Sequence, residues 1–157
     1  MAEESDPRTI RSLAVTVGDV VTAYEARRRS SRRPVLRATP PFSGRMRARL
    51  HDPGPDRDSA ESGTDVDPET GALQVPPARF VAEPEIPAYP SPDDTEDALR
   101  ADPDAEFSVD RHRERHVRAV AEWREAVAEA LVDAVPIRLA DGTHRIAVKT
   151  LDGPGEL

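Results

Sequence analysis

Hydrophobic and polar positions alternate most regularly in residues 45–51, which read Arg-Met-Arg-Ala-Arg-Leu-His. Strict alternation of this kind is typical of a pleated strand, and residues 35–39 form a second short run with strand character. Residues 40–44, Pro-Pro-Phe-Ser-Gly, have the composition of a turn. The pattern therefore predicts a β-hairpin whose second strand sends its apolar side chains to the core and its arginines outward. The side chains expected to face the core are Met46, Ala48 and Leu50.

Apolar residues at helical spacing predict three helices outside this hairpin. The first is capped by Thr16 and ends near Arg29, and a short one covers residues 91–100. The main helix runs over 108–135, and a closing hairpin follows over 137–150. One side of the main helix is expected to be apolar through Val109, Val117, Val120, Trp123, Val127, Leu131 and Ala134.

The remaining segments complete the predicted organisation. Residues 52–71 are acidic and rich in Gly, Pro, Ser and Asp, so we expect a flexible loop there, and a short strand over 72–75. Residues 152–157 are expected to form a loose tail. The whole chain of 157 residues is predicted to be one α+β domain, a small mainly antiparallel sheet packed on one long helix, with shorter N-terminal helices.

Composition removes several classes of function. The chain contains no cysteine, which excludes disulfides, thiolate nucleophiles and thiolate zinc sites. Its N-terminus is acidic and no run approaches the length of a membrane span, so we expect a cytoplasmic protein with no membrane partner. Phosphate-binding glycine loops, nucleophile elbows and two-histidine zinc motifs are missing from the sequence, so the prediction is a non-enzymatic protein without a cofactor.

Charge is distributed unevenly along the chain. The 30 acidic residues outnumber 22 basic ones, and Lys149 is the single lysine. This acidic, lysine-poor balance suits a cell interior at molar salt. Residues 27–51 contain nine arginines and no acidic residue, whereas residues 52–106 contain 16 acidic and three basic residues. A basic block is thus followed at once by an acidic one.

Two stretches carry a resemblance to a known family. Residues 36–50, Leu-Arg-Ala-Thr-Pro-Pro-Phe-Ser-Gly-Arg-Met-Arg-Ala-Arg-Leu, and residues 89–96, Tyr-Pro-Ser-Pro-Asp-Asp-Thr-Glu, resemble a family of small haloarchaeal proteins that carry no assigned function. The likeness extends over most of the chain outside 52–71. It implies a high-salt cytoplasm and supplies no catalytic residues.

The arginines of the predicted hairpin are the main candidate site. Same-strand members repeat at about 6.5 Å, close enough to contact successive phosphates. The candidate residues for nucleic-acid or anion binding are Arg37, Arg45, Arg47, Arg49, Phe42, Arg32 and Arg33. At molar salt the Debye length is about 3 Å, so only short contacts persist, and the forked hydrogen bonds of arginine suit them. The alternatives are an acidic segment that folds back onto these arginines, and a protein interface.

Three further features have competing interpretations. Phe42 could stack on a base or plug the turn from inside. His112 and His116 lie four residues apart and could bind a metal, but neighbouring arginines favour a solvated helix surface. The carboxylates of Asp93, Asp94, Glu96 and Asp97 fit ordinary helix-start chemistry better than catalysis or a cation site.

These observations lead to two hypotheses of function. The first is a non-enzymatic accessory or regulatory protein that binds nucleic acid, RNA or single strands, through the arginine-rich hairpin. The second is a protein–protein interaction module of a larger cytoplasmic assembly. The sequence predicts neither the oligomeric state nor a small-molecule ligand.

Overall fold

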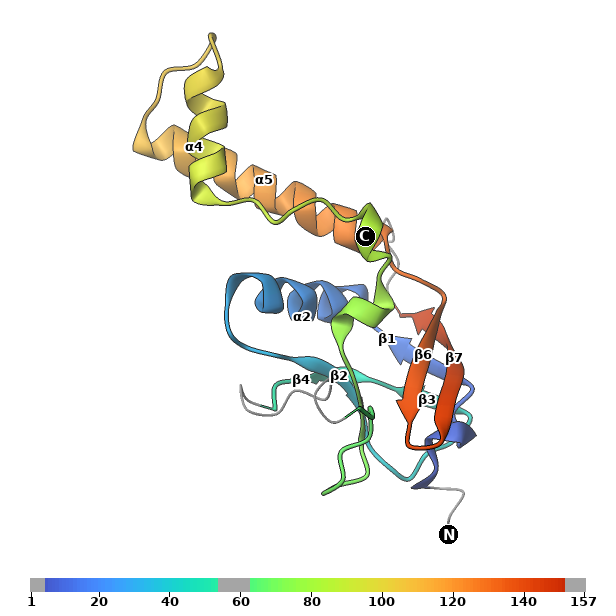
Figure 1. Ribbon diagram of the computed structural model, residues 1–157. Helices are drawn as coiled ribbons and strands as arrows, with labels where there is room; N and C mark the ends of the chain where they lie inside the picture. The colour runs from blue at the N-terminus through green and yellow to red at the C-terminus, as the bar shows by residue number, and fades with distance from the viewer. Residues whose placement is uncertain (1–4, 54–62, 152–157) are drawn as a thin grey trace.

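The computed structural model describes residues 5–53 and 63–151, which adopt an α+β fold (Figure 1). Three α-helices and seven strands lie within these two stretches. In chain order the elements are η1 (Pro7–Thr9), β1 (Ser12–Val15), α2 (Val17–Arg29), β2 (Val35–Ala38), β3 (Arg45–Arg47), β4 (Arg49–His51), β5 (Leu73–Val75), η2 (Pro77–Phe80), η3 (Glu83–Glu85), α4 (Pro92–Ala101), α5 (Val109–Glu129), β6 (Ala134–Leu139) and β7 (Gly142–Thr150).

A four-stranded mixed sheet, in the order β3-β1-β7-β6, forms one side of the molecule. Strand β1 is central and pairs in parallel with β3 on one side and with β7 on the other. Only the β6–β7 pair of this sheet is antiparallel. The expectation of one mainly antiparallel sheet is therefore wrong here, because β1 was not predicted and it joins strands that are far apart in sequence.

A second, three-stranded sheet is antiparallel throughout, in the order β4-β2-β5. Strand β2 pairs with β4 and places Arg37 opposite Arg49, so the predicted antiparallel pairing is confirmed for the last three residues of 45–51. The predicted second strand, however, is divided between the two sheets. Ala48 is buried at the division, and its amide donates to the Ala14 carbonyl at 2.9 Å. The segment 45–51 thus connects both sheets.

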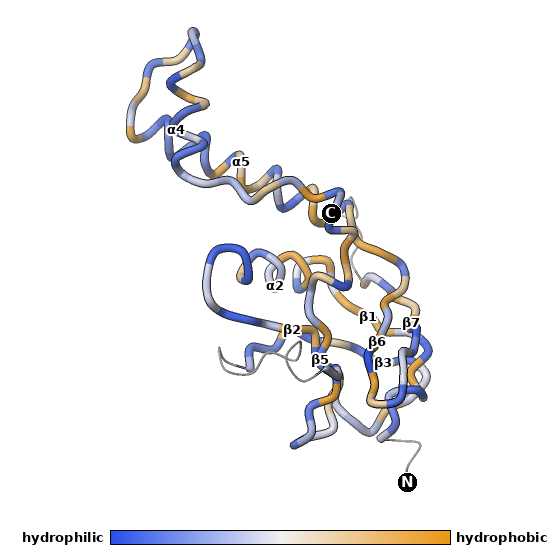
Figure 2. The backbone as a smooth tube through the Cα atoms, in the orientation of Figure 1, coloured by the Kyte–Doolittle hydropathy of each residue, from blue (hydrophilic) through white to orange (hydrophobic). Residues whose placement is uncertain are grey.

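Helix α2 follows the sequence prediction closely. The Thr16 hydroxyl accepts a hydrogen bond from the Asp19 amide, and Val20 and Tyr24 are buried on the predicted apolar face. The helix packs against β2 and β4, and it contributes to one apolar cluster with residues from both sheets and from α5. Figure 2 shows the hydrophobic segments gathered where α2, β1 and β2 meet.

Helix α5 differs from the long helix that the pattern predicted. It ends at Glu129 rather than Val135, because the backbone of residues 130–132 pairs with residues 80–82 instead. It packs on α2 and α4 and not chiefly on a sheet, and with α4 it forms an arm that projects from the body (Figure 1). Val109 and Val117 lie on this arm and are 68% and 63% exposed, so the predicted apolar face is buried only in the second half of the helix.

The closing hairpin is confirmed, with Ile146 and Val148 of β7 pointing inward. Gly142 follows Asp141 at the turn with φ of 147°, a backbone conformation that favours glycine. Strand β6 begins at Ala134 and therefore includes Pro136, which the pattern placed outside it. Proline is tolerated because β6 is an edge strand of the mixed sheet.

Residues 52–71 were expected to form a flexible acidic loop, and 54–62 of them lie outside the described residues. The expected tail, 152–157, also lies outside. Residues 63–71 are described, and Asp65 within them is fully buried. Its carboxylate accepts from the Arg138 amide at 2.6 Å and pairs with the Arg79 guanidinium. Across residues 5–53 and 63–151, no helix is both long enough and apolar enough to cross a membrane.

Candidate nucleic-acid interface

Three arginines of the 45–51 segment are exposed. Arg45 and Arg47 belong to β3 and Arg49 to β4, whereas Ala48 between them is buried. We call Arg45, Arg47 and Arg49 the arginine row. Within β3, alternation places Arg45 and Arg47 about 6.5 Å apart on one face, and Arg49 follows in the neighbouring sheet. Met46 packs on the core as predicted, but Leu50 is 40% exposed because β4 is an edge strand.

The arginine row lacks acidic partners within the part of the chain that the structure describes. No guanidinium group of Arg45, Arg47 or Arg49 forms an ion pair or hydrogen bond with residues 5–53 or 63–151. The side-chain contact nearest in sequence is the Ser43 hydroxyl, which donates to the Arg45 carbonyl and leaves its guanidinium uninvolved. Three like charges on one exposed ribbon are a surface suited to successive anionic groups.

Arg37 lies across the second sheet from Arg49 and is half-buried. Its Nη2 donates to the Thr70 hydroxyl at 3.3 Å, and that hydroxyl donates to the Asp67 carboxylate at 2.9 Å. Its Nε is buried without a hydrogen-bond partner. Part of the acidic segment thus contacts Arg37, as one of the alternatives supposed, and within residues 63–71 it does so for this arginine and not for the arginine row.

His51 ends β4 beside these arginines. Burial of the imidazole lowers its pKa, and the charge of Arg37 lowers it further, while Asp52 and Asp67 oppose the shift. His51 is therefore neutral at neutral pH and adds no charge to the surface.

The other predicted site residues are used by the fold itself. Arg32 lies 3.6 Å from the Asp52 carboxylate, and Arg33 donates to the carbonyls of Ser30 and Arg32 near the end of α2. Phe42 is only 4% exposed and belongs to the core cluster. Its ring is therefore a turn plug, and the hypothesis that it stacks on a base is wrong for this conformation.

The structure adds two basic residues that sequence reasoning missed. Arg145 and Lys149 of β7 are exposed and alternate with the buried Ile146 and Val148, so they point away from the core. Strand β1 places them on the same face of the mixed sheet as Arg45 and Arg47, since Ala14 pairs with both Arg47 and Lys149. The alternation of residues 143–150 was visible in the sequence, but the parallel pairing of β7 with β1 was not.

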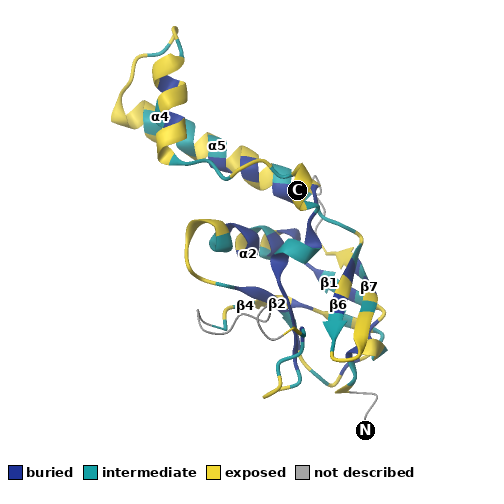
Figure 3. Ribbon diagram, in the orientation of Figure 1, coloured by how far each residue is buried: buried dark blue, intermediate teal, exposed yellow. Residues whose placement is uncertain are grey.

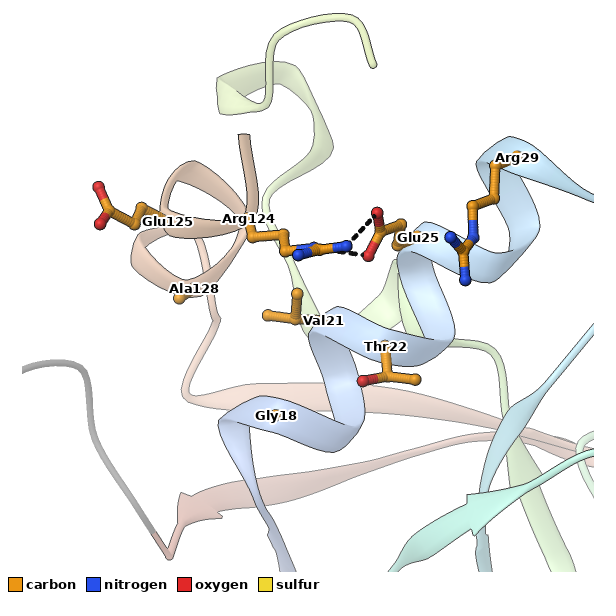
Figure 4. Close-up of a pocket in the computed structure, with 8 residues that line it drawn as sticks. All are labelled: Gly18, Val21, Thr22, Glu25, Arg29, Arg124, Glu125 and Ala128. Atoms are coloured by element: carbon orange, nitrogen blue, oxygen red, sulfur yellow. Dashed lines mark hydrogen bonds and ion pairs between the residues drawn. The ribbon is translucent and has the colours of Figure 1, made fainter. Parts of the chain in front are cut away.

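A pocket of about 490 Å³ lies between α2 and α5 and is the second candidate site (Figure 4). Glu25 is buried there, and both of its oxygens accept hydrogen bonds from Arg124, at 2.8 and 3.0 Å. Tyr89 donates a third hydrogen bond at 2.7 Å. Burial raises the pKa of the Glu25 carboxyl, but the bonds from Arg124 and Tyr89 outweigh burial and hold this pKa below its ordinary value.

Glu25, Arg124 and Tyr89 therefore satisfy one another's hydrogen bonds in this pocket. Figure 4 shows Arg124 directed at Glu25, with Arg29 on the next turn of α2. A ligand would have to displace an internal bidentate pair to reach the carboxylate, so this pocket is better explained as the junction that joins α5 to α2.

The two histidines of α5 contact the neighbouring helix α4. His112 Nε2 lies 2.9 Å from the Pro92 carbonyl, and His116 Nδ1 lies 2.9 Å from the Thr95 hydroxyl. Both rings therefore contact α4. Within residues 5–53 and 63–151, no three His, Asp or Glu side chains gather as metal ligands would.

Comparison with known proteins identifies a family whose description assigns no function. No curated protein and no solved structure matches the chain. A family profile does match residues 1–152, nearly the whole chain. The chain therefore belongs to the family described as a domain of unknown function (DUF8009).

Proposed function

We propose that this protein is a non-enzymatic accessory or regulatory protein that binds nucleic acid, RNA or single strands, through the arginine row and Arg37. One observation carries the proposal: the three guanidinium groups of the row are exposed and have no acidic partner among residues 5–53 and 63–151. The chain as a whole carries a net charge of −8, so the exposed arginine row is a local exception that favours an anionic partner.

The proposed setting is the cytoplasm of a salt-adapted archaeal cell. The excess of acidic residues and the single lysine support it. At molar salt the Debye length of about 3 Å leaves only contacts at hydrogen-bond distance. Arginine suits this condition because its guanidinium can form two parallel hydrogen bonds to one phosphate.

Fluorescence anisotropy with a short labelled RNA in molar KCl tests the proposal. The triple variant Arg45→Gln/Arg47→Gln/Arg49→Gln is expected to bind at least about tenfold more weakly, with a salt slope smaller by about 2, since each single-strand phosphate contact contributes about 0.7. The matched control is Arg111→Gln/Arg113→Gln/Arg118→Gln, which removes the same charge from the arm. Equal loss in both variants, or no binding by the wild type, would overturn the proposal.

A protein–protein interaction module is the second candidate, and the arm favours it. Val109 and Val117 project from α5 with most of their side chains exposed. Pull-downs after nuclease digestion should compare the wild type with Val109→Ser/Val117→Ser. A protein that the wild type retains and the variant loses would support this function, whereas identical retention would remove it.

A further inference from the structure

We propose that the basic surface accommodates one extended nucleic-acid strand, which lies along β1 and is bound through its backbone without regard to base sequence. This inference rests on the proposed function and narrows its ligand. It arises from a second group of cations that faces the arginine row across the mixed sheet.

The two groups of cations flank the central strand of the sheet. Arg45 and Arg47 of β3 stand on one side of β1, and Arg145 and Lys149 of β7 stand on the other. Ala14 fixes the registration, because it pairs with Arg47 and with Lys149. We call Arg145 and Lys149 the second bank. Neither residue forms an ion pair with the described part of the chain.

Between the banks the sheet carries only short side chains. Ser12 and Ala14 of β1 point to this outer face, as does Ala147 of β7, and all three are half-buried. Long basic side chains therefore flank this strip of short ones, which we call the floor. Two inter-strand spacings separate the Cα atoms of the flanking strands by about 10 Å. Figure 3 shows the exposed residues of β7 toward the two ends of the strand.

The spacing of these cations favours one strand over a duplex. Arg45 and Arg47 follow the two-residue repeat of a strand, about 6.5 to 7 Å, which is close to the phosphate repeat of a stretched single strand. Arg145 and Lys149 lie four residues apart, about 13 Å, or two such repeats. A single sugar–phosphate backbone lying on the alanine floor can be contacted from both banks. A duplex is too wide to reach that floor and would touch only the tips of the banks.

Among the described residues, this face offers no aromatic side chain on which a base could stack. Its outward residues are Arg, Lys, Ser, Ala, Thr and Pro, and Phe42, the aromatic residue of the neighbouring turn, is buried. Sequence-tolerant single-strand binders usually stack bases on aromatic side chains, and this face must rely on phosphate contacts instead. Binding is therefore expected to depend steeply on salt and weakly on sequence.

Anisotropy with the full chain tests this inference. The probes are labelled oligo(dT), a mixed-sequence single strand of equal length and the duplex of that strand. The wild type should bind both single strands within about twofold of each other and the duplex at least about tenfold more weakly. Arg145→Gln/Lys149→Gln should weaken single-strand binding about tenfold and lower the salt slope by about 1.4, while Arg111→Gln/Arg113→Gln changes binding less than about twofold.

Each contrary outcome has a distinct meaning. If the arginine-row variant abolishes binding but Arg145→Gln/Lys149→Gln does not weaken it, or if the duplex binds as tightly, the inference is overturned and the proposed function stands. If polyglutamate competes as well as oligo(dT), the basic surface binds acidic peptides equally well and the inference is overturned. If no nucleic acid binds at all, the proposed function fails first and the inference with it.

Discussion

Two arginine-dense regions of this protein have different surroundings. In the first half of α5, Arg115 pairs with Asp102 at 2.9 Å, Arg111 donates to the Glu106 carbonyl at 2.9 Å, and Arg113 lies 3.9 Å from Asp110. In the arginine row, no guanidinium group has such a partner within the described residues. Arginine density alone therefore does not mark a binding surface.

The difference follows from the local sequence and its geometry. Asp110 lies three residues before Arg113, a spacing that a helix brings together. Asp102 and Glu106, which contact Arg115 and Arg111, lie in the segment between α4 and α5. A strand sends neighbours to opposite faces, and residues 27–51 contain no acidic residue at all. Paired arginines should accordingly contribute to folding and unpaired ones to binding. Four predictions test this distinction.

The largest effect is expected at Asp65, a buried carboxylate shared by two arginines. Asp65→Ala would leave Arg79 and Arg138 without their acidic partner, and loss of one member of a buried ion pair costs about 3 to 5 kcal/mol. Urea unfolding followed by circular dichroism measures the free energy of unfolding. The control is Asp141→Ala, which breaks the exposed pair with Arg8 and should cost less than about 1 kcal/mol. Similar small losses in both variants would contradict the distinction.

A smaller effect, dependent on pH, is expected at the junction of α2 and α5. Glu25→Gln removes the charge that Arg124 contacts through two hydrogen bonds and should cost about 2 kcal/mol at neutral pH. The pKa of Glu25 is lower in the folded protein than in the unfolded chain. The stabilisation is therefore present above the unfolded value, about 4.3, and is lost as pH falls through the folded value.

Urea unfolding at neutral pH and near pH 3 measures this dependence. The difference in stability between wild type and Glu25→Gln should shrink in acid. Glu125→Gln, an exposed carboxyl on the same pocket, is the matched control and should change little at either pH. A Glu25→Gln loss that does not vary with pH would show that the charge of Glu25 contributes nothing to folding.

The arm should respond more weakly still. Thr95 is buried on α4, and its hydroxyl lies 2.9 Å from His116 Nδ1 on α5. The variant Thr95→Val keeps the shape but removes this hydrogen bond, at a cost of about 1 kcal/mol. Amide hydrogen exchange should quicken in α4 and remain unchanged in β7, whereas Asp97→Asn, on the exposed side of α4, should alter neither. Unchanged exchange in α4 would mean that the histidines do not hold the arm.

Sequence reasoning was most successful where the determining contacts are local. The caps at Thr16, Ser91 and Ser108 were predicted, and their hydroxyls each accept the expected backbone amide. The hairpin of 35–39 with 45–51 was predicted from alternation and turn composition within one short stretch, and it is confirmed for 49–51 but not for 45–47, which pairs with β1.

The missed features depend on contacts between distant residues. Strand β1 is four residues long with two large apolar side chains, and its partner β7 lies some 130 residues away, so nothing local indicates a strand. Asp65 resembles its polar neighbours in composition, yet Arg138, 73 residues later, holds it in the interior. For the site, the exposure of the arginine row and the turn-plug role of Phe42 could be inferred from local sequence, whereas the opposing second bank could not.

The smallest effect on folding is expected for the arginine row itself. Its guanidinium groups are exposed and contact no carboxylate in residues 5–53 or 63–151, so Arg45→Gln, Arg47→Gln and Arg49→Gln should each change the free energy of unfolding by less than about 0.5 kcal/mol. Arg45 and Arg47 stand about 6.5 Å apart, so removing one of these like charges should raise the free energy of unfolding slightly at low salt. This gain should vanish in molar KCl. Urea unfolding at both salt concentrations measures it. A loss above about 1.5 kcal/mol for the triple variant would mean that the chain's own acids neutralise the row, and the contrast with α5 would disappear.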